Sequence, residues 1–156
     1  MFPGAFFGKP GPAMTTDAEL LSIFAEVRTI ACVGLSNDPA RPAHNVARYL
    51  GLKGFRVIPV NPLHAGETLL GEMTYPDLAS LPPELGPIHM VDIFRRSEQA
   101  GAVVDAALAH LTGRGLRVIW MQIGVIDTAA AARAEARGIK VVMDRCPKIE
   151  FERLRG

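Results

Sequence analysis

The chain has 156 residues, enough for one domain with a sizeable hydrophobic core and too few for two. Hydrophobic residues make up 49% and charged residues 21%, and no apolar run approaches the roughly 18 residues of a transmembrane helix. The 17 basic and 16 acidic residues give a net charge of +1, so we expect neither nucleic acid nor a membrane as a partner.

The first residues of the chain differ in composition from the rest. Residues 1–14 are rich in glycine and proline and lack the charged start and apolar centre of a signal peptide, so we expect a flexible leader there, or a start at Met14. A single domain is expected to fill residues 15–156. Cys32 and Cys146 form no CxxC motif and lie in or just after predicted strands, which favours a reduced, cytoplasmic protein.

The domain is predicted to begin with a helix and a strand–helix–strand unit. Residues 16–19 (Thr-Asp-Ala-Glu) have the pattern of a capping box, which starts a helix. Residues 30–62 then read as an apolar strand, a loop, a helix with one apolar face and a second apolar strand. Such βαβ units force parallel strands. The loop of residues 34–41 and Asn61-Pro62 are therefore expected at the same edge of the sheet, where open α/β sheets bind ligands.

The rest of the chain alternates strands with helices. Apolar runs predict three further strands at residues 88–94, 117–124 and 140–144. Ser97 is expected to be the N-cap of the helix after the first of these, and Asp127 the N-cap of an alanine-rich helix after the second. Residues 63–87, with many glycines and prolines, predict a short extra strand and one-turn helices.

This alternation determines the expected fold class. The strands are apolar runs without a two-residue period, which is typical of a parallel sheet that is buried on both faces. The sequence therefore predicts an α/β, Rossmann-like fold with helices on both faces of the sheet. We expect five strands, or six if residues 63–87 add one. With the five long strands numbered along the chain, the expected order is 3-2-1-4-5.

The first loop of the βαβ unit favours a phosphate ligand over a nicotinamide cofactor. It has one glycine, Gly34, where a dinucleotide fingerprint has three, and the second strand ends in Asn61 without the carboxylate that binds ribose. Ser36 can still donate hydrogen bonds, the following helix offers its N-terminus, and Arg41 adds a positive charge. We expect a side chain at Gly34 to block the phosphates from the backbone while leaving the domain folded.

Six separated segments resemble a known family. They are residues 33–39 (Val-Gly-Leu-Ser-Asn-Asp-Pro), Arg41-Pro42, residues 57–62 (Val-Ile-Pro-Val-Asn-Pro), residues 91–98 (Val-Asp-Ile-Phe-Arg-Arg-Ser-Glu), residues 120–124 (Trp-Met-Gln-Ile-Gly) and residues 141–146 (Val-Val-Met-Asp-Arg-Cys). With them, the chain resembles the small bacterial and archaeal CoA-binding-domain proteins. It is also similar to the CoA-binding domain of the succinyl-CoA synthetase α subunit and of related nucleoside-diphosphate-forming acyl-CoA synthetases.

The resemblance implies a ligand and a set of contacts. It implies that the first loop holds the phosphates of coenzyme A or an acyl-CoA, that the adenine end lies near residues 60–62, and that the pantetheine arm passes residues 94–95 and 122–124. The implied cofactor-binding residues are Gly34, Leu35, Ser36, Asn37, Pro39, Arg41, Pro42, His44, Val60, Asn61, Pro62, Phe94, Arg95, Arg96, Gln122 and Gly124. The phosphohistidine of the synthetases belongs to a second domain, which has no counterpart in these residues.

Other reactive side chains have simpler expected roles. Arg95 and Arg96 either contact phosphate or pair with a nearby carboxylate such as Asp92. Asp92 itself lies in an apolar strand and is expected to bond a strand-end amide. His44 is expected to be a solvated or capping residue, and Cys146 a packed thiol. The sequence predicts no metal site and no catalytic residue.

We therefore expect a stand-alone, non-catalytic domain that binds coenzyme A or an acyl-CoA, as a carrier, a sensor or a module for a partner enzyme or subunit. Two alternatives stay open. One is an NAD(P)-dependent oxidoreductase, against which the glycine pattern and the missing carboxylate count. The other is a protein-interaction module built on the same scaffold.

Overall fold

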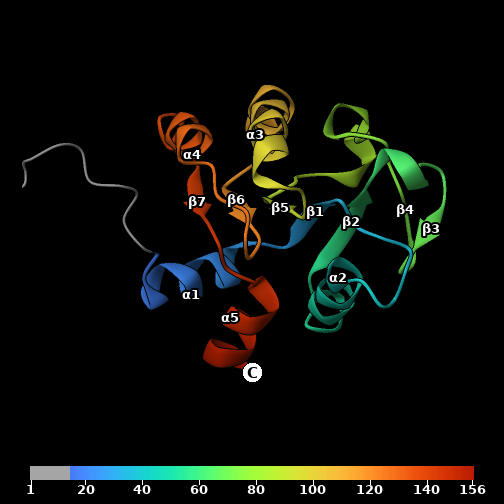
Figure 1. Ribbon diagram of the computed structural model, residues 1–156, viewed down its shortest axis with the longest axis horizontal. Helices are drawn as coiled ribbons and strands as arrows, with labels where there is room; N and C mark the ends of the chain where they lie inside the picture. The colour runs from blue at the N-terminus through green and yellow to red at the C-terminus, as the bar shows by residue number, and fades with distance from the viewer. Residues whose placement is uncertain (1–14) are drawn as a thin grey trace, which may run out of the picture.

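Five parallel strands form the central sheet of the computed structural model, which describes residues 15–156; the leader expected at residues 1–14 lies outside this part. The strands are β1 (Thr29–Val33), β2 (Arg56–Val60), β5 (Met90–Ile93), β6 (Val118–Met121) and β7 (Lys140–Val142). The helices are α1 (Asp17–Glu26), α2 (Pro42–Leu52), α3 (Ser97–Leu111), α4 (Thr128–Glu135) and α5 (Pro147–Arg155). Helices α3 and α4 cover one face of the sheet, and α1, α2 and α5 cover the other (Figure 1). The α/β, Rossmann-like class is thus confirmed.

The strand order differs from the expected one. The sheet runs β2-β1-β5-β6-β7, so the third long strand, β5, pairs with β1 and not with β2. The outer edge of β2 is occupied by Tyr75, which forms a parallel bridge with Val60 and donates from its backbone N–H to Pro59 O at 3.0 Å. The possible sixth strand of the main sheet is limited to this bridge at Tyr75. The residues before it form a separate small antiparallel hairpin of β3 (Thr68–Leu69) and β4 (Glu72–Met73).

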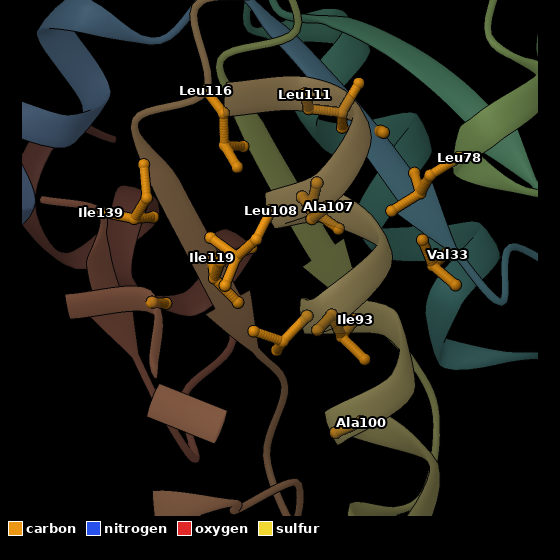
Figure 2. Close-up of a cluster of buried hydrophobic side chains, with 14 of the residues drawn as sticks. Val33, Leu78, Ile93, Ala100, Ala107, Leu108, Leu111, Leu116, Ile119 and Ile139 are labelled. Carbon is orange, nitrogen blue, oxygen red and sulfur yellow. The ribbon is translucent and has the colours of Figure 1, made fainter. Parts of the chain in front are cut away.

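Each strand contributes to a hydrophobic core on both faces of the sheet. In β1, Ala31 and Val33 point toward α3 and α4, whereas Ile30 and Cys32 point toward α1, α2 and α5. Figure 2 shows the first of these cores, in which side chains of α3 lie over the residues of β1, β5 and β6. In a strand that is buried on both faces, the side chains that alternate between the faces are all apolar. The sequence of such a strand is therefore a continuous apolar run without a two-residue period.

The predicted helix starts agree with the structure at two of three places. Thr16 and Glu19 form the reciprocal capping box of α1, and the Asp127 carboxylate accepts from Ala130 N–H at 3.0 Å at the start of α4. Ser97 is not the N-cap of α3: the helix begins at Ser97 itself, and Arg96 occupies the cap position. In residues 15–156, the structure contains no helix that is both long enough and apolar enough to span a membrane.

Candidate ligand-binding site

The strand order places a topological switch point between the ends of β1 and β5. From β1 the chain passes through α2 to β2 on one side, whereas β5, on the other side of β1, leads into α3. Helices α2 and α3 therefore leave the sheet on opposite faces, as Figure 1 shows. Open α/β sheets bind ligands at such a switch point, outside the carboxyl ends of the strands. We call the region formed by residues 34–41 and residues 94–96 at this switch point the switch-point crevice.

Gly34 brings the two sides of this crevice into direct contact. Its φ is +95°, and a Cβ added there would lie 2.3 Å from the carbonyl oxygen of Phe94. Its N–H donates to Val60 O at 2.8 Å, and Phe94 N–H donates to Val33 O at 2.8 Å. Glycine is thus required here by the close approach of the Phe94 backbone. The expectation that a substitution at Gly34 would leave the fold intact is corrected by this contact.

The first loop is braced by its own side chains. The Ser36 hydroxyl accepts from Asp38 N–H at 3.0 Å, and the Asp38 carboxylate accepts from Ala40 N–H at 2.9 Å. Half-buried His44 places Nδ1 3.0 Å from Ser36 O, so this side chain contacts the first loop, while part of its ring stays exposed to solvent. The Asn37 amide donates to the Glu67 carboxylate at 3.1 Å. The loop is therefore pre-formed, and the Ser36 O–H remains a donor.

Three arginines carry positive charge at the crevice. Arg41 and Arg96 are exposed and stand at the N-cap positions of α2 and α3, and half-buried Arg95 directly precedes Arg96. Within the described residues, none of the three forms an ion pair, so of the two alternatives for Arg95 and Arg96 the pairing with a carboxylate does not occur. Neither helix start is closed by a side-chain cap. Two helix N-termini and three cations therefore favour a phosphorylated anion here.

The predicted site residues after β2 have mainly structural contacts. Asn61 is 5% exposed; its amide donates to Leu35 O at 3.1 Å, and its side-chain oxygen accepts from Leu63 N–H at 3.0 Å. Val60 and Leu35 are buried in the core, whereas Pro39 in the first loop, Pro42 at the start of α2 and Pro62 after β2 are exposed. Asn61 thus ties the ends of β1 and β2 together, which shapes the crevice.

Two residues that the sequence analysis did not count among the site residues, Ser97 and Asp144, hold the loop after β6. The Ser97 hydroxyl donates to Gly124 O at 3.2 Å and accepts from Ile126 N–H at 2.9 Å. The Asp144 carboxylate accepts from Gly124 N–H at 2.8 Å. Both are polar residues soon after a buried strand, the same signal that identified the first loop. They connect the loop after β6 to those after β5 and β7.

Asp92 and Gln122 are buried polar side chains with oxygen atoms that have no hydrogen-bond partner among the described residues. Asp92, in β5, is 1% exposed, and within the described residues neither carboxylate oxygen has a hydrogen bond; the expected bond to a strand-end amide is absent. Burial raises the pKa of Asp92 well above its ordinary value. Gln122, just after β6, is 9% exposed, and its Oε1 also has no partner. A buried polar group without a hydrogen-bond partner lowers the stability of the fold by about 1–3 kcal/mol, so these oxygen atoms are candidates for contacts with a ligand or water.

The remaining candidates do not form a reactive site. Cys32 and Cys146 are buried free thiols, and the pKa of Cys32 is raised well above its ordinary value by burial and by the nearby Asp92. His64 lies 3.2 Å from the Glu67 carboxylate, and His89 Nδ1 accepts the backbone N–H groups of residues 28 and 29. Among residues 15–156, no group of three or more histidine, cysteine or carboxylate side chains could hold a metal ion.

Comparisons with known proteins agree with this geometry. A family model described as a CoA binding domain matches residues 28–152. The uncharacterized protein YneT of Bacillus subtilis (strain 168) is 34% identical over 132 residues, which are 85% of this chain and 91% of that protein. A solved structure from Thermus thermophilus is 36% identical with a TM-score of 0.80, covering 89% of this chain and 98% of that one.

The fold also recurs inside a larger enzyme. The dinucleotide-forming acetyl-coenzyme A synthetase 1 of Ca. Korarchaeum cryptofilum, solved in complex with phosphate and ADP, aligns with a TM-score of 0.60 at 23% identity. The alignment covers 74% of this chain and 25% of that one. At this identity the likeness concerns the fold alone.

Proposed function

The chain belongs to the family of CoA-binding domains, and from this membership we propose that it binds coenzyme A or an acyl-CoA as a stand-alone domain. The observation that carries the proposal is the switch-point crevice with its three arginines free of ion pairs among the described residues. Coenzyme A carries a diphosphate and a 3′-phosphate, which match Arg41, Arg95 and Arg96 and the two helix N-termini in charge. The Ser36 hydroxyl adds a neutral donor in the first loop.

The first expected result is selective binding of coenzyme A. We expect isothermal titration calorimetry to show coenzyme A binding about tenfold or more tightly than NAD, a difference of about 1.4 kcal/mol. NAD lacks a third phosphate, and the crevice has no carboxylate at Asn61 to hold the ribose of NAD. Tighter binding of NAD than of coenzyme A would exclude the proposed function.

Matched arginine variants connect that binding to the crevice. Arg41→Gln removes one cation at the start of α2 and is expected to weaken coenzyme A binding about tenfold, as the loss of a charge-assisted hydrogen bond does. Arg137→Gln serves as the control, because exposed Arg137 lies just before β7, at the opposite end of the sheet. Equal effects of the two substitutions would mean that the general charge of the protein, and not the crevice, attracts the ligand.

We further propose that the chain catalyses no acyl-CoA synthesis and acts as a carrier, a sensor or a module for a partner enzyme, in the reducing cytoplasm that its free thiols suit. Nucleotide-driven thioester formation needs a residue that carries the phosphoryl group, most plausibly a histidine. The two histidines nearest the first loop are already engaged: His44 Nδ1 lies 3.0 Å from Ser36 O, and His64 Nδ1 lies 3.2 Å from the Glu67 carboxylate.

The corresponding prediction concerns the isolated protein. Incubated with ATP or GTP, magnesium, coenzyme A and short carboxylic acids, it is expected to form neither a thioester nor a phosphorylated histidine, as measured by mass spectrometry. An ADP-forming acetyl-CoA synthetase in the same assay is the positive control. Any thioester that His44→Gln abolishes would identify His44 as a phosphoryl carrier and contradict the prediction.

A further inference from the structure

A second hollow lies at the end of the sheet opposite to the switch-point crevice. Helix α5 packs between α1 and α2 on one face of the sheet (Figure 1), and a pocket of about 290 Å³ opens where these three helices end. Its walls come from the ends of α1 and α5 and from the residues just before β1 and β2. The five residues of β1, roughly 16 Å of strand, separate this hollow from the crevice. We call it the helix-end pocket.

The floor of the helix-end pocket is aromatic. Phe24, Phe55 and Phe151 line it, and each of these rings is less than a tenth exposed. Every pair among them packs edge to face, with ring centroids 5.1 to 6.5 Å apart, which fixes the orientation of the rings. An apolar cavity of about 150 Å³ can hold one benzene ring, so the helix-end pocket has room for a ring with a short polar tail.

The rim of the helix-end pocket is cationic. Arg28, Lys53 and Arg155 line it with exposed side chains, and no carboxylate side chain of the described chain lines it with them. None of the three forms an ion pair with another described residue. A concave surface with charges of one sign raises the local concentration of ions of the opposite sign, so this rim favours an anion.

Two of these cations stay available to a ligand. The C-terminal ends of α1, α2 and α5 carry partial negative charge, and Arg28 compensates part of it, since its Nη1 donates to a last-turn carbonyl of α1 at 3.4 Å. Lys53 and Arg155 instead contact aromatic rings. Lys53 Nζ lies 5.5 Å from the centroid of the Tyr49 ring. The Arg155 guanidinium lies 5.7 Å from the centroid of the Phe151 ring. Both charges are therefore held beside the pocket without an anionic partner in the described part of the chain.

We propose that the helix-end pocket binds a small aromatic carboxylate, in addition to the coenzyme A proposed for the crevice. The ring of this ligand packs edge to face against the phenylalanine floor, and its carboxylate meets Lys53 and Arg155 at the rim. The planar guanidinium of Arg155 matches a carboxylate through two parallel hydrogen bonds, and the Lys53 ammonium adds a point charge. Because the length of the sheet lies between the two sites, the two ligands are expected to bind independently.

A nuclear magnetic resonance titration of the whole protein tests the proposal with 3-phenylpropionate as the probe. The expected result is saturable binding in the millimolar range, with larger backbone amide shifts at residues 27–28 and 53–55 than at residues 34–37. Two analogues separate the ring from the charge, since 3-phenylpropionamide lacks the charge and acetate lacks the ring. Each analogue is expected to bind at least about fivefold more weakly than the probe.

Matched variants connect this binding to the helix-end pocket. Lys53→Gln and Arg155→Gln are each expected to weaken binding of the probe about threefold, the effect of one exposed charge pair. Ala25→Trp fills the pocket from the last turn of α1 without changing its charge and is expected to abolish binding. Arg48→Gln is the control and should leave the affinity unchanged, because Arg48 is an exposed arginine of α2 outside the pocket.

Several results would overturn this second site. Equal binding of the acid and its amide would mean that the cations take no part, and a loss of stability without a loss of affinity in Lys53→Gln and Arg155→Gln would assign them to the helix ends alone. Displacement of the probe by coenzyme A would place it in the crevice. Equal losses for Arg48→Gln and Lys53→Gln would reduce the effect to the general charge of the protein. Absence of any binding of the probe would also overturn the site, while coenzyme A binding, measured separately, would stand.

Discussion

Replacing Gly34 with valine is expected to lower the free energy of unfolding by about 2–6 kcal/mol, because strain and overpacking add. The backbone of Gly34 has a φ of +95°, which a β-branched residue rarely adopts. A Cβ there would also lie 2.3 Å from Phe94 O and 3.2 Å from Phe94 Cβ, so the ends of β1 and β5 would have to separate. Urea denaturation followed by circular dichroism measures the loss, and coenzyme A binding should disappear with it.

Two milder substitutions separate the sources of this cost. Gly138 has a φ of +80° and no heavy atom within 4 Å of an added Cβ, so Gly138→Ala should cost only the backbone strain, about 1–2 kcal/mol. Gly34→Ala adds the collision with Phe94 and is expected to cost clearly more. If the two alanine variants are equally stable, the close approach of β1 and β5 is not what requires glycine at residue 34.

Asp92→Asn is expected to change how stability depends on pH. Burial raises the pKa of Asp92 in the folded protein, whereas in the unfolded chain the carboxyl titrates near its ordinary value of about 3.9. The folded state therefore binds one more proton than the unfolded state between these two values. The stabilisation from this proton is fully present below the unfolded pKa and is lost as the pH rises toward the folded pKa.

The measurable quantity is the difference in unfolding free energy between wild type and Asp92→Asn. It should fall by about 1.4 kcal/mol for each pH unit above the unfolded pKa, for as long as the folded carboxyl stays protonated. Asp92→Leu should show the same loss of pH dependence, since it also removes the titrating group. The Cys32 thiol does not interfere, because its pKa is raised from an already alkaline value. A constant difference between pH 5 and 8 would show that Asp92 is not held neutral by burial.

The sequence by itself determined the βαβ unit and the capping of α1 and α4. These features depend on residues close together in the chain: an apolar run, a helical stripe, and a Thr16 or Asp127 side chain that reaches an amide three residues away. The first loop was found for the same reason, because polar residues and a glycine directly follow a buried strand. Ser97 was misplaced by one position, since its hydroxyl bonds the distant loop of Gly124 rather than its own helix.

Only the tertiary structure decided the strand order and the pairing of side chains across strands. Tyr75 occupies the outer edge of β2, and β5 pairs with the free edge of β1. The residue pattern within a single strand does not show which edge of a neighbouring strand is available for pairing. The contact of Gly34 with Phe94 and the shared face of Asp92 and Gln122 both follow from this order. Each joins residues about thirty or more positions apart, and such contacts depend on how the whole sheet packs, which the period of a single segment does not encode.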